Sequence, residues 1–237
     1  MSTLPALSRA LGRQLRSPNG IGGHLVGRLM RLANARPNAL AIQALALQPG
    51  HHVLEVGCGP GHGLRLLCKR QPRALVHGLD RSAAMIAQAQ AANRRAIRDG
   101  HVRLYHGRFE RLPFESATMD AVLAVNVAYF WQDAPTIVGE IRRVLRPGGR
   151  LSLYVTDAET MRRWPFAEAA THRHFDPSGL RQTLEAGGFE TGRIAIRRQA
   201  VGLGVLGLLA TADTPDRAIS STMTSLCDSD NCVRSTK

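Results

Sequence analysis

A glycine-rich turn directly after an apolar strand has the clearest chemical meaning in this sequence. Residues 53–56 form a short apolar segment with a single acid, Glu55, and glycine then occupies positions 57, 59, 61 and 63. Glycine has no side chain and tolerates positive φ, so the backbone of such a turn can approach a ligand closely. A strand, a glycine turn and a helix N-terminus in this order are typical of a nucleotide-type site at the carboxyl edge of a sheet.

The spacing of these glycines excludes two common nucleotide motifs. The dinucleotide fingerprint G-x-G-x-x-G needs a sixth-position glycine, but His62 stands there when the count starts at Gly57, and Leu64 when it starts at Gly59. No Gly-Lys-Ser/Thr follows, which excludes a P-loop. The pattern that remains is E-x-G-x-G-x-G, an open turn with room for a ligand other than a pyrophosphate.

Four further signals follow this turn in chain order. Asp80 ends the next predicted strand, where a carboxylate can accept both hydroxyl groups of a ribose. Taken alone, Asp80 could equally be a helix cap; its position after the glycine turn favours the ribose role. The other three signals are the segments 107–114, 120–131 and 142–149.

The five signals together, over about residues 50–160, resemble the class I S-adenosylmethionine-dependent methyltransferases. The branch that they resemble most is the small-molecule, type 11-like branch, which includes the ubiquinone and menaquinone C-methyltransferases. The resemblance implies an α/β fold: a Rossmann-like, doubly wound, mostly parallel seven-stranded sheet with helices on both faces and an N-terminal helical extension. It also implies S-adenosylmethionine as cofactor, a small-molecule methyl acceptor and in-line methyl transfer.

The resemblance assigns a role to each predicted cofactor residue. Glu55 and Asn126 are expected near the methionine end, Asp80 at the ribose, and Phe109 and Glu110 beside the adenine. The family often has an acid where this chain has Arg108, which cannot accept a hydrogen bond, so either Glu110 substitutes or the adenine contacts come from the backbone. The complete predicted set is Glu55, Gly57, Cys58, Gly59, Gly61, Asp80, Arg81, Phe109, Glu110 and Asn126.

The acceptor pocket is less clearly marked, and no catalytic residue is assigned. The candidates are Tyr129, Trp131, His172 and His174. Tyr129 and Trp131 are expected as pocket wall, and His174 is more often a surface or capping residue than a base. A base is needed only if the acceptor is protonated at neutral pH, because the sulfonium is already activated.

Composition favours one soluble α/β domain. The chain has 237 residues, of which 44% are hydrophobic, and no apolar run reaches the roughly 18 residues of a membrane span. No secretory signal is recognisable, so a cytoplasmic location is expected. The cysteines lack metal-binding spacing, and we expect no metal; they are Cys58, Cys68, Cys227 and Cys232.

The net charge of +13 leaves other partners open. Residues 1–54 contain no acid, so a basic N-terminus could contact RNA or, through residues 5–16, an anionic membrane. Amino-directed nucleic-acid methyltransferases usually carry two prolines where this chain has Val127 and Ala128, and no cysteine lies between Cys68 and Cys227 to attack a cytosine. Nucleic acid is therefore the less favoured partner, peripheral membrane contact stays possible, and the oligomeric state stays open.

Hydrophobic periodicity and turn residues predict the elements and the domain limits. We expect an N-terminal helical extension or lid over 1–49, the methyltransferase domain over 50–212, and a disordered tail over 213–237. The predicted helices cover 7–15, 24–34, 38–48, 63–70, 82–98, 134–145 and 177–186. The predicted strands cover 53–56, 74–80, 102–106, 119–125, 151–156, 194–196 and 201–209.

Overall fold

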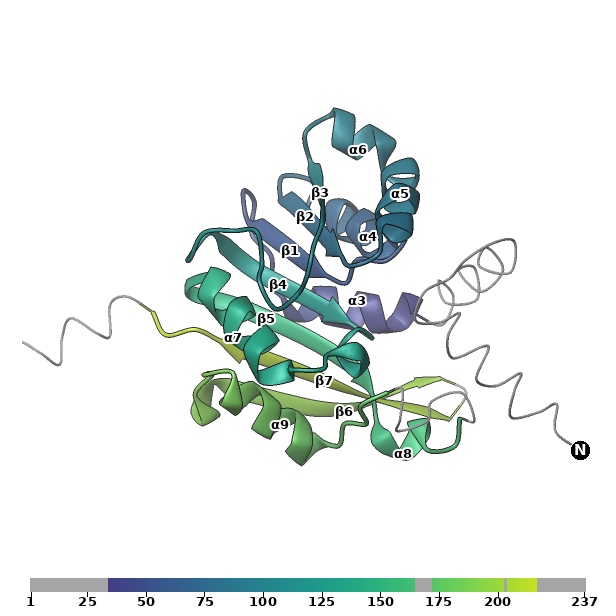
Figure 1. Cartoon of the computed structure of the whole chain (residues 1–237), viewed down its shortest axis with the longest axis vertical. Helices are drawn as coiled ribbons and strands as arrows, with labels where there is room; N and C mark the ends of the chain where they lie inside the picture. The colour runs from purple at the N-terminus through teal and green to yellow at the C-terminus, as the bar shows by residue number, and fades with distance from the viewer. Residues whose placement is uncertain (1–33, 165–171, 203, 217–237) are drawn as a thin grey trace, which may run out of the picture.

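The fold is built on one seven-stranded sheet (Figure 1). The structure is a computed structural model that describes residues 34–164, 172–202 and 204–216. The strand order across the sheet is β3-β2-β1-β4-β5-β7-β6. The strands are β1 (His52–Val56), β2 (Leu75–Asp80), β3 (Val102–His106), β4 (Met119–Val125), β5 (Leu145–Thr156), β6 (Ile194–Gly202) and β7 (Val205–Asp213).

Most of the sheet is parallel, as the sequence predicts. β1 pairs in parallel with β2 and β4, β2 with β3, and β4 with β5, whereas β7 runs antiparallel to both β5 and β6. The chain builds outward from β1 to β3 on one side and then from β4 on the other, so the order reverses between β1 and β4. In open α/β sheets this reversal opens a crevice at the carboxyl ends of the strands, where ligands bind.

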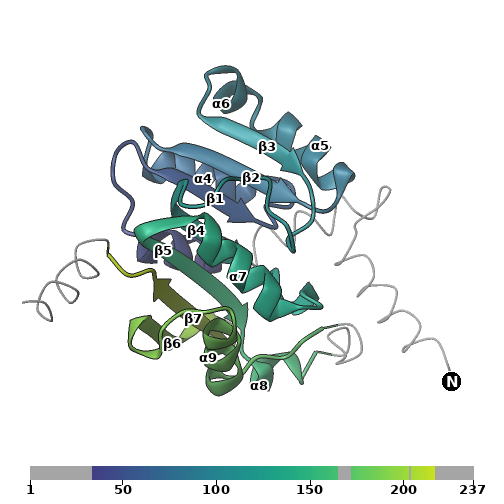
Figure 2. The same cartoon turned by 60° about the vertical axis from the view of Figure 1, so that its left-hand side comes forward.

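Helices cover both faces of the sheet (Figure 2). On one face, α3, α4 and α5 pack on side chains such as Val53, Val76 and Leu123. On the other, α7 and α9 pack on side chains such as Leu54 and Val122. The described helices are α3 (Ala35–Ala44), α4 (His62–Arg70), α5 (Ala83–Ala92), α6 (Arg94–Arg98), α7 (Ala134–Val144), α8 (Ala158–Met161), α9 (Pro177–Ala186) and the 3-10 turns η1 (Ala128–Phe130) and η2 (Thr191–Arg193).

Two helices differ from the sequence prediction at asparagines whose side chains donate to backbone carbonyls. α3 begins at Ala35, and Asn38, the predicted N-cap, lies inside it and donates to the carbonyl of Asn34 at 2.7 Å. The single helix predicted over 82–98 is divided at Asn93, whose amide donates to the carbonyls of Gly61 (3.1 Å) and Ala89 (2.9 Å). Asn93 therefore fastens the glycine turn to the end of α5.

β5 and β6 are much longer than predicted, and β7, predicted over 201–209, lies four residues later in the chain. β5 begins at Leu145, so the Pro147-Gly148-Gly149 segment belongs to it rather than only ending the helix before it. β6 continues through Arg197 and Arg198, because exposed polar side chains are acceptable on an edge strand. The turn to β7 contains Gly202 and Gly204, both with positive φ.

The last strand ends four residues past its predicted limit at 209. Asp213 is the last residue of β7 and accepts from Arg150 at 2.7 Å, and the Thr214 hydroxyl donates to the carbonyl of Gly149. The helices predicted over 7–15 and 24–34 and the tail after 216 lie outside the described residues. None of the described helices is long and apolar enough to cross a membrane.

Candidate active site

The glycine turn after β1 is folded back across the end of β2. The backbone N–H groups of Gly57 and Cys58 both donate to the carbonyl of Leu79, at 2.8 and 3.1 Å, and Gly61 N–H donates to the carbonyl of Cys58 at 3.0 Å. These bonds are made within the protein, so the turn has its shape before any ligand arrives. It lies beside the β1–β4 reversal, where the fold predicts a binding crevice.

The physical reason that favours glycine differs among the three central positions of the turn, 57, 59 and 61. All three have positive φ. A Cβ on Gly57 would lie 2.3 Å from a methyl carbon of Val127, and one on Gly61 would lie 2.4 Å from the Asn93 amide nitrogen. A Cβ on Gly59 would meet no atom within 4 Å. Packing within the protein thus requires two of these glycines, whereas Gly59 borders open space that a ligand can use.

Asp80 joins the glycine turn to the end of β2. One carboxylate oxygen accepts from Gly59 N–H at 2.9 Å and the other from Ser82 N–H at 2.8 Å. Burial raises the pKa of Asp80, and these backbone bonds oppose the rise. Each carboxylate oxygen has two lone pairs, so both can still accept from a ligand hydroxyl. The cap at the start of α5 is made by Ser82, which accepts from Met85 N–H.

Glu55 is buried beneath the start of α4, with only 5% of its surface exposed. Its carboxylate lies flat against Gly63, where an added Cβ would be 2.0 Å from Oε1. Burial, and second the charge of Asp80, raise the pKa of Glu55 to about 8. The same burial raises the pKa of the Cys58 thiol, which keeps that thiol protonated.

Two neighbouring acids, Glu55 and Asp80, form a site suited to a cation. After burial, the charge of Asp80 is the second reason for the raised pKa of Glu55, and both acids raise the pKa of Cys58. A positive charge bound nearby lowers the cost of ionising both carboxyl groups. The sulfonium and ammonium groups of S-adenosylmethionine have the charge that this acidic pair favours.

The segment after β3 brings the predicted adenine residues to the same edge. The guanidinium of Arg81 lies over the ring of Phe109, 5.9 Å from its centre, so these two predicted residues are in contact. Phe109 is almost fully buried. Arg108, the departure from the family pattern, forms an exposed ion pair with Glu110 at 3.5 Å.

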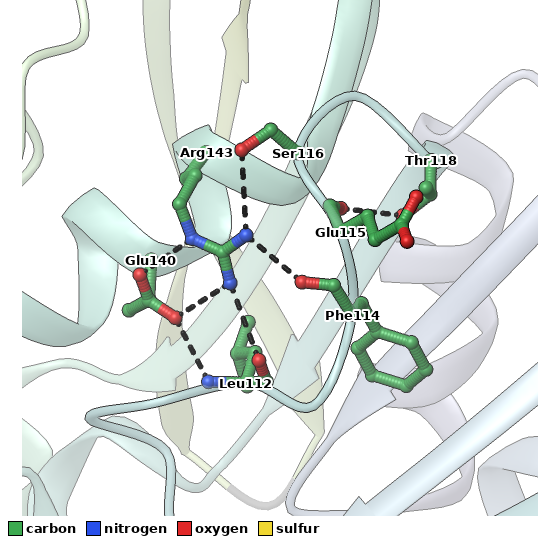
Figure 3. A network of polar contacts seen from close by, with 7 residues as sticks. All are labelled: Leu112, Phe114, Glu115, Ser116, Thr118, Glu140 and Arg143. Carbon is green, nitrogen blue, oxygen red and sulfur yellow. Dashed lines mark hydrogen bonds and ion pairs between the residues drawn. The ribbon is translucent and has the colours of Figure 1, made fainter.

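No helix separates β3 from β4, and side chains of α7 hold the connecting segment (Figure 3). Arg143 makes a two-pronged pair with Glu140 and donates to the carbonyls of Phe114 (2.8 Å) and Leu112 (3.2 Å). Glu140 in turn accepts from Leu112 N–H at 2.8 Å. The ring of Phe114 packs edge-on against Tyr105, with centres 4.8 Å apart. Phe109 and Glu110 are therefore carried on an anchored segment.

Asn126 and Tyr129 form a hydrogen-bonded pair at the end of β4. Asn126 has a φ of 53°, an unusual value for a residue with a side chain, which recurs at functional sites. Its amide donates to Asn34 Oδ1 at 2.7 Å and accepts from the Tyr129 hydroxyl at 2.6 Å. The same hydroxyl also accepts from Thr156 N–H. Val127, the next residue, packs on Gly57, so the ends of β1 and β4 meet at the predicted site.

The other acceptor-pocket candidates lie further along this edge. Trp131 is 2% exposed, and its indole nitrogen has no hydrogen-bond partner among the described residues. His172 is buried beside Phe130, with ring centres 5.0 Å apart, and His174 is half-buried. Their roles stay predictions.

Several supporting residues were not recognised from the sequence. Asn34, Asn93 and Val127 each touch a predicted site residue, but none belongs to a local pattern that predicts the contact. Arg143 lies inside the 142–149 segment that carried one of the five signals, yet its contacts to residues 112–116 depend on the tertiary fold. Within the described ranges, no group of three or more histidine, cysteine or acidic side chains is placed to hold a metal.

Comparison with known proteins identifies the family of this chain. Residues 54–153 match the family described as Methyltransferase domain. The chain is 32% identical over 135 residues to YdaC of Bacillus subtilis, named an uncharacterized methyltransferase, and the match covers 57% of this chain and 72% of that protein. It is also 37% identical over 122 residues to the cycloartenol-C-24-methyltransferase of Arabidopsis thaliana, covering 50% of this chain but only 36% of that enzyme.

A solved structure has the same fold. One chain in the complex of the Haloferax volcanii Trm112 methyltransferase activator with a methyltransferase superposes with a TM-score of 0.68 at 19% identity, over 79% of this chain and 93% of that one. The glycine turn, the acid after β2 and the segments after β3 and β4 all lie inside or next to the matched family region. The chain belongs to the class I S-adenosylmethionine-dependent methyltransferases, and S-adenosylmethionine is its cofactor.

Proposed function

We propose that this enzyme transfers the methyl group of S-adenosylmethionine to a small organic molecule, and that the predicted cofactor residues form the binding pocket. The main support for the pocket is the open space beside Gly59, next to a carboxylate of Asp80 that already holds the turn. Glu55 lies near the carboxyl end of β1, Asn126 directly follows β4, and Phe109 and Glu110 lie in the segment after β3, so all four are at the same edge of the sheet.

The bound cofactor would supply a methyl group on a positively charged sulfur, which needs alignment more than activation. The chain's own residues provide that alignment. Asp80 would accept from the ribose hydroxyls while it holds Gly59, and the Glu55–Asp80 pair would favour the cationic end. The anchored segment with Phe109 and Glu110 would border the adenine.

A small acceptor is favoured by the surroundings of Tyr129. Its hydroxyl is bound to Asn126 and Thr156, and its ring is buried, so it is not free to stack on an extruded base. The acceptor side beyond it is formed by the apolar ring of Phe130 and by His172. The Arabidopsis relative is named for methylation of cycloartenol, which is a small molecule.

The first test is calorimetric titration with S-adenosylmethionine and S-adenosylhomocysteine, with NADH as the control ligand. We expect the first two to bind and NADH not to bind. In Asp80→Asn the affinity should fall about 10- to 100-fold, because a charge-assisted acceptor is lost. Asp99→Asn is the matched control, since Asp99 only pairs with exposed arginines on α6 and should leave binding unchanged.

Two results would contradict this proposal. Unchanged affinity in Asp80→Asn would show that the cofactor lies elsewhere. Methyl transfer to RNA together with salt-sensitive RNA binding, and no transfer to any small acceptor in a screen, would replace the small-molecule assignment with a nucleic-acid one.

A further inference from the structure

We infer that Tyr129 is a positioning residue for the cofactor: it acts through Asn126, whose side-chain amide it orients, and its hydroxyl links that amide to Thr156 at the end of β5. The inference rests on the proposed function, because Asn126 belongs to the proposed pocket. It also changes the expected role of Tyr129, which the sequence suggests as part of the acceptor-pocket wall.

The direction of each hydrogen bond around Tyr129 follows from chemistry. The N–H of Thr156 can only donate, so the Tyr129 oxygen accepts there. The single phenol proton is then given to Asn126 Oδ1, at 2.6 Å. Asn126 must therefore turn its oxygen toward Tyr129 and its NH₂ group away, toward Asn34 Oδ1 at 2.7 Å. Tyr129 thus decides which end of the Asn126 amide faces which way.

The backbone of Asn126 makes this control necessary. A φ of 53° costs an L-residue about 1–2 kcal/mol, and asparagine is among the few that adopt it. The backbone N–H of Asn126 donates to the carbonyl of Tyr154 at 2.9 Å, which ties the start of the turn to β5. With the backbone fixed there and the side chain fixed by Tyr129 and Asn34, little freedom is left in the residue.

Tyr129 also reaches the acceptor side. Its backbone carbonyl accepts from Arg173 N–H at 2.9 Å, and its ring lies 6.2 Å from that of His172, measured between centres. The side chain is 8% exposed, and burial raises the pKa of Tyr129 well above its ordinary value. The phenol therefore keeps its proton across the physiological range and remains a donor to Asn126, which suits positioning and does not suit a catalytic base.

The chain offers matched controls for this test, because it has three tyrosines. Tyr129→Phe removes the phenol hydroxyl with almost no change of shape. Tyr105→Phe removes a hydroxyl that lies 3.3 Å from His77 Nδ1 and bonds that ring instead of Asn126, and Tyr154→Phe removes a buried hydroxyl without a partner among the described residues. We would measure affinity for S-adenosylhomocysteine by calorimetry, and thermal unfolding, for all three variants.

We expect Tyr129→Phe to bind S-adenosylhomocysteine about tenfold more weakly, and both control variants to bind it as the wild type does. Asn34→Ala, which removes the other partner of the amide, should give a smaller loss of about threefold. Equal affinity of Tyr129→Phe and wild type would overturn the inference.

A double-mutant cycle separates positioning from a general loss of stability. If Tyr129 acts through Asn126, then Tyr129→Phe adds little further loss of affinity in an Asn126→Ala background. Full additivity of the two losses would overturn the inference. A wild-type protein that does not bind S-adenosylhomocysteine at all would contradict the proposed function itself, whereas normal wild-type binding with an unaffected Tyr129→Phe contradicts only this inference.

Discussion

The two sides of the pocket are built in different ways. On the cofactor side, the ends of β1 and β2 are joined by backbone groups: Gly57, Cys58 and Gly59 donate to Leu79 or Asp80. On the acceptor side, at the ends of β4 and β5, contacts between side chains and distant segments predominate, such as Tyr129 with Thr156 and Arg198 with the buried Asp157 at 2.8 Å. Close backbone packing requires particular residue types at fixed spacing, whereas side-chain contacts between distant segments leave no local pattern.

This difference also separates two kinds of sensitivity. A change on the cofactor side should alter stability and cofactor binding together, because the same backbone bonds serve both. A change in an acceptor-side contact that does not reach Asn126 should alter stability and leave cofactor binding intact. Three experiments test this contrast, from the largest expected effect to the smallest.

Gly57→Ala should be the most damaging. Its Cβ would lie 2.3 Å from a Val127 methyl carbon, at a φ of 74°, so both overpacking and backbone strain apply. We expect a loss of about 3–5 kcal/mol in the free energy of unfolding, measured by urea denaturation, with weaker S-adenosylhomocysteine binding. Gly50→Ala is the control: its φ is 82° and a Cβ there meets nothing within 4 Å, so only the strain of about 1–2 kcal/mol should remain.

A partial rescue of Gly57→Ala by Val127→Ala would confirm that the contact across the strand reversal is the cause. Equal losses in the Gly50 and Gly57 variants would show that backbone strain alone matters, and the description of a tightly packed cofactor side would then be wrong.

Glu55, on the cofactor side, should make the free energy of unfolding depend on pH. Burial, and second the charge of Asp80, raise the pKa of Glu55 from its ordinary value of 4.5 to about 8, so between these values the folded state binds more protons than the unfolded state. The contribution of Glu55 to the free energy of unfolding is fully present below about pH 4.5 and is lost as the pH rises toward 8. Between pH 5 and 8 the free energy of unfolding should fall by about 3–4 kcal/mol. Glu55→Gln, which resembles the protonated acid, should remove this slope in denaturation measured across the range.

A wild-type slope that persists in Glu55→Gln would mean that Glu55 is ionised in the folded protein or that another group titrates. Glu185→Gln is a suitable control, because Glu185 lies on α9, far along the chain from the glycine turn, and should leave the slope unchanged.

Substitutions of two arginines compare the cofactor side with the acceptor side most directly. Arg143 anchors the segment that carries Phe109 and Glu110, and Arg198 pairs with Asp157 at the end of β5. We expect Arg143→Met and Arg198→Met each to cost about 1–3 kcal/mol of stability, since each leaves buried acceptors without a donor. Only Arg143→Met should also weaken S-adenosylhomocysteine binding, by a few-fold. If both variants, or neither, weaken binding, the contrast between the two sides does not hold.

The cofactor side was largely predictable from the sequence. The glycine turn and Asp80 have residue types whose backbone freedom or charge is needed at those positions, and the family resemblance implied the mostly parallel sheet. The limits of the long strands were harder to predict, because β6 carries exposed arginines that a hydrophobic pattern does not include. The break at Asn93 could not be foreseen, since its cause is a bond to Gly61, a residue that is distant in sequence.

The acceptor side was predicted only as a set of candidates. The position of Tyr129 after β4 makes it an acceptor-pocket candidate, but its bonds to Asn126 and Thr156 depend on the pairing of β4 with β5. No local sequence pattern marks Asn34 as a site residue, because its partner, Asn126, follows β4 and only the fold brings the two together.

Because side chains are excluded at the three glycine positions for different reasons, natural selection should act differently on each of them. Gly57 and Gly61 are required by neighbouring protein atoms, so a descendant that lost the ability to bind the cofactor would still be selected to keep them in order to fold. A Cβ on Gly59 would meet nothing within 4 Å among the described residues, so no neighbouring protein atom excludes a side chain there, and only its positive φ and the proposed ligand do. After a loss of activity, Gly59 would be the first of the three to drift, with asparagine as the replacement that its positive φ admits most readily. A related sequence that keeps the outer two glycines and has lost the middle one should therefore be interpreted as a fold retained without its catalysis.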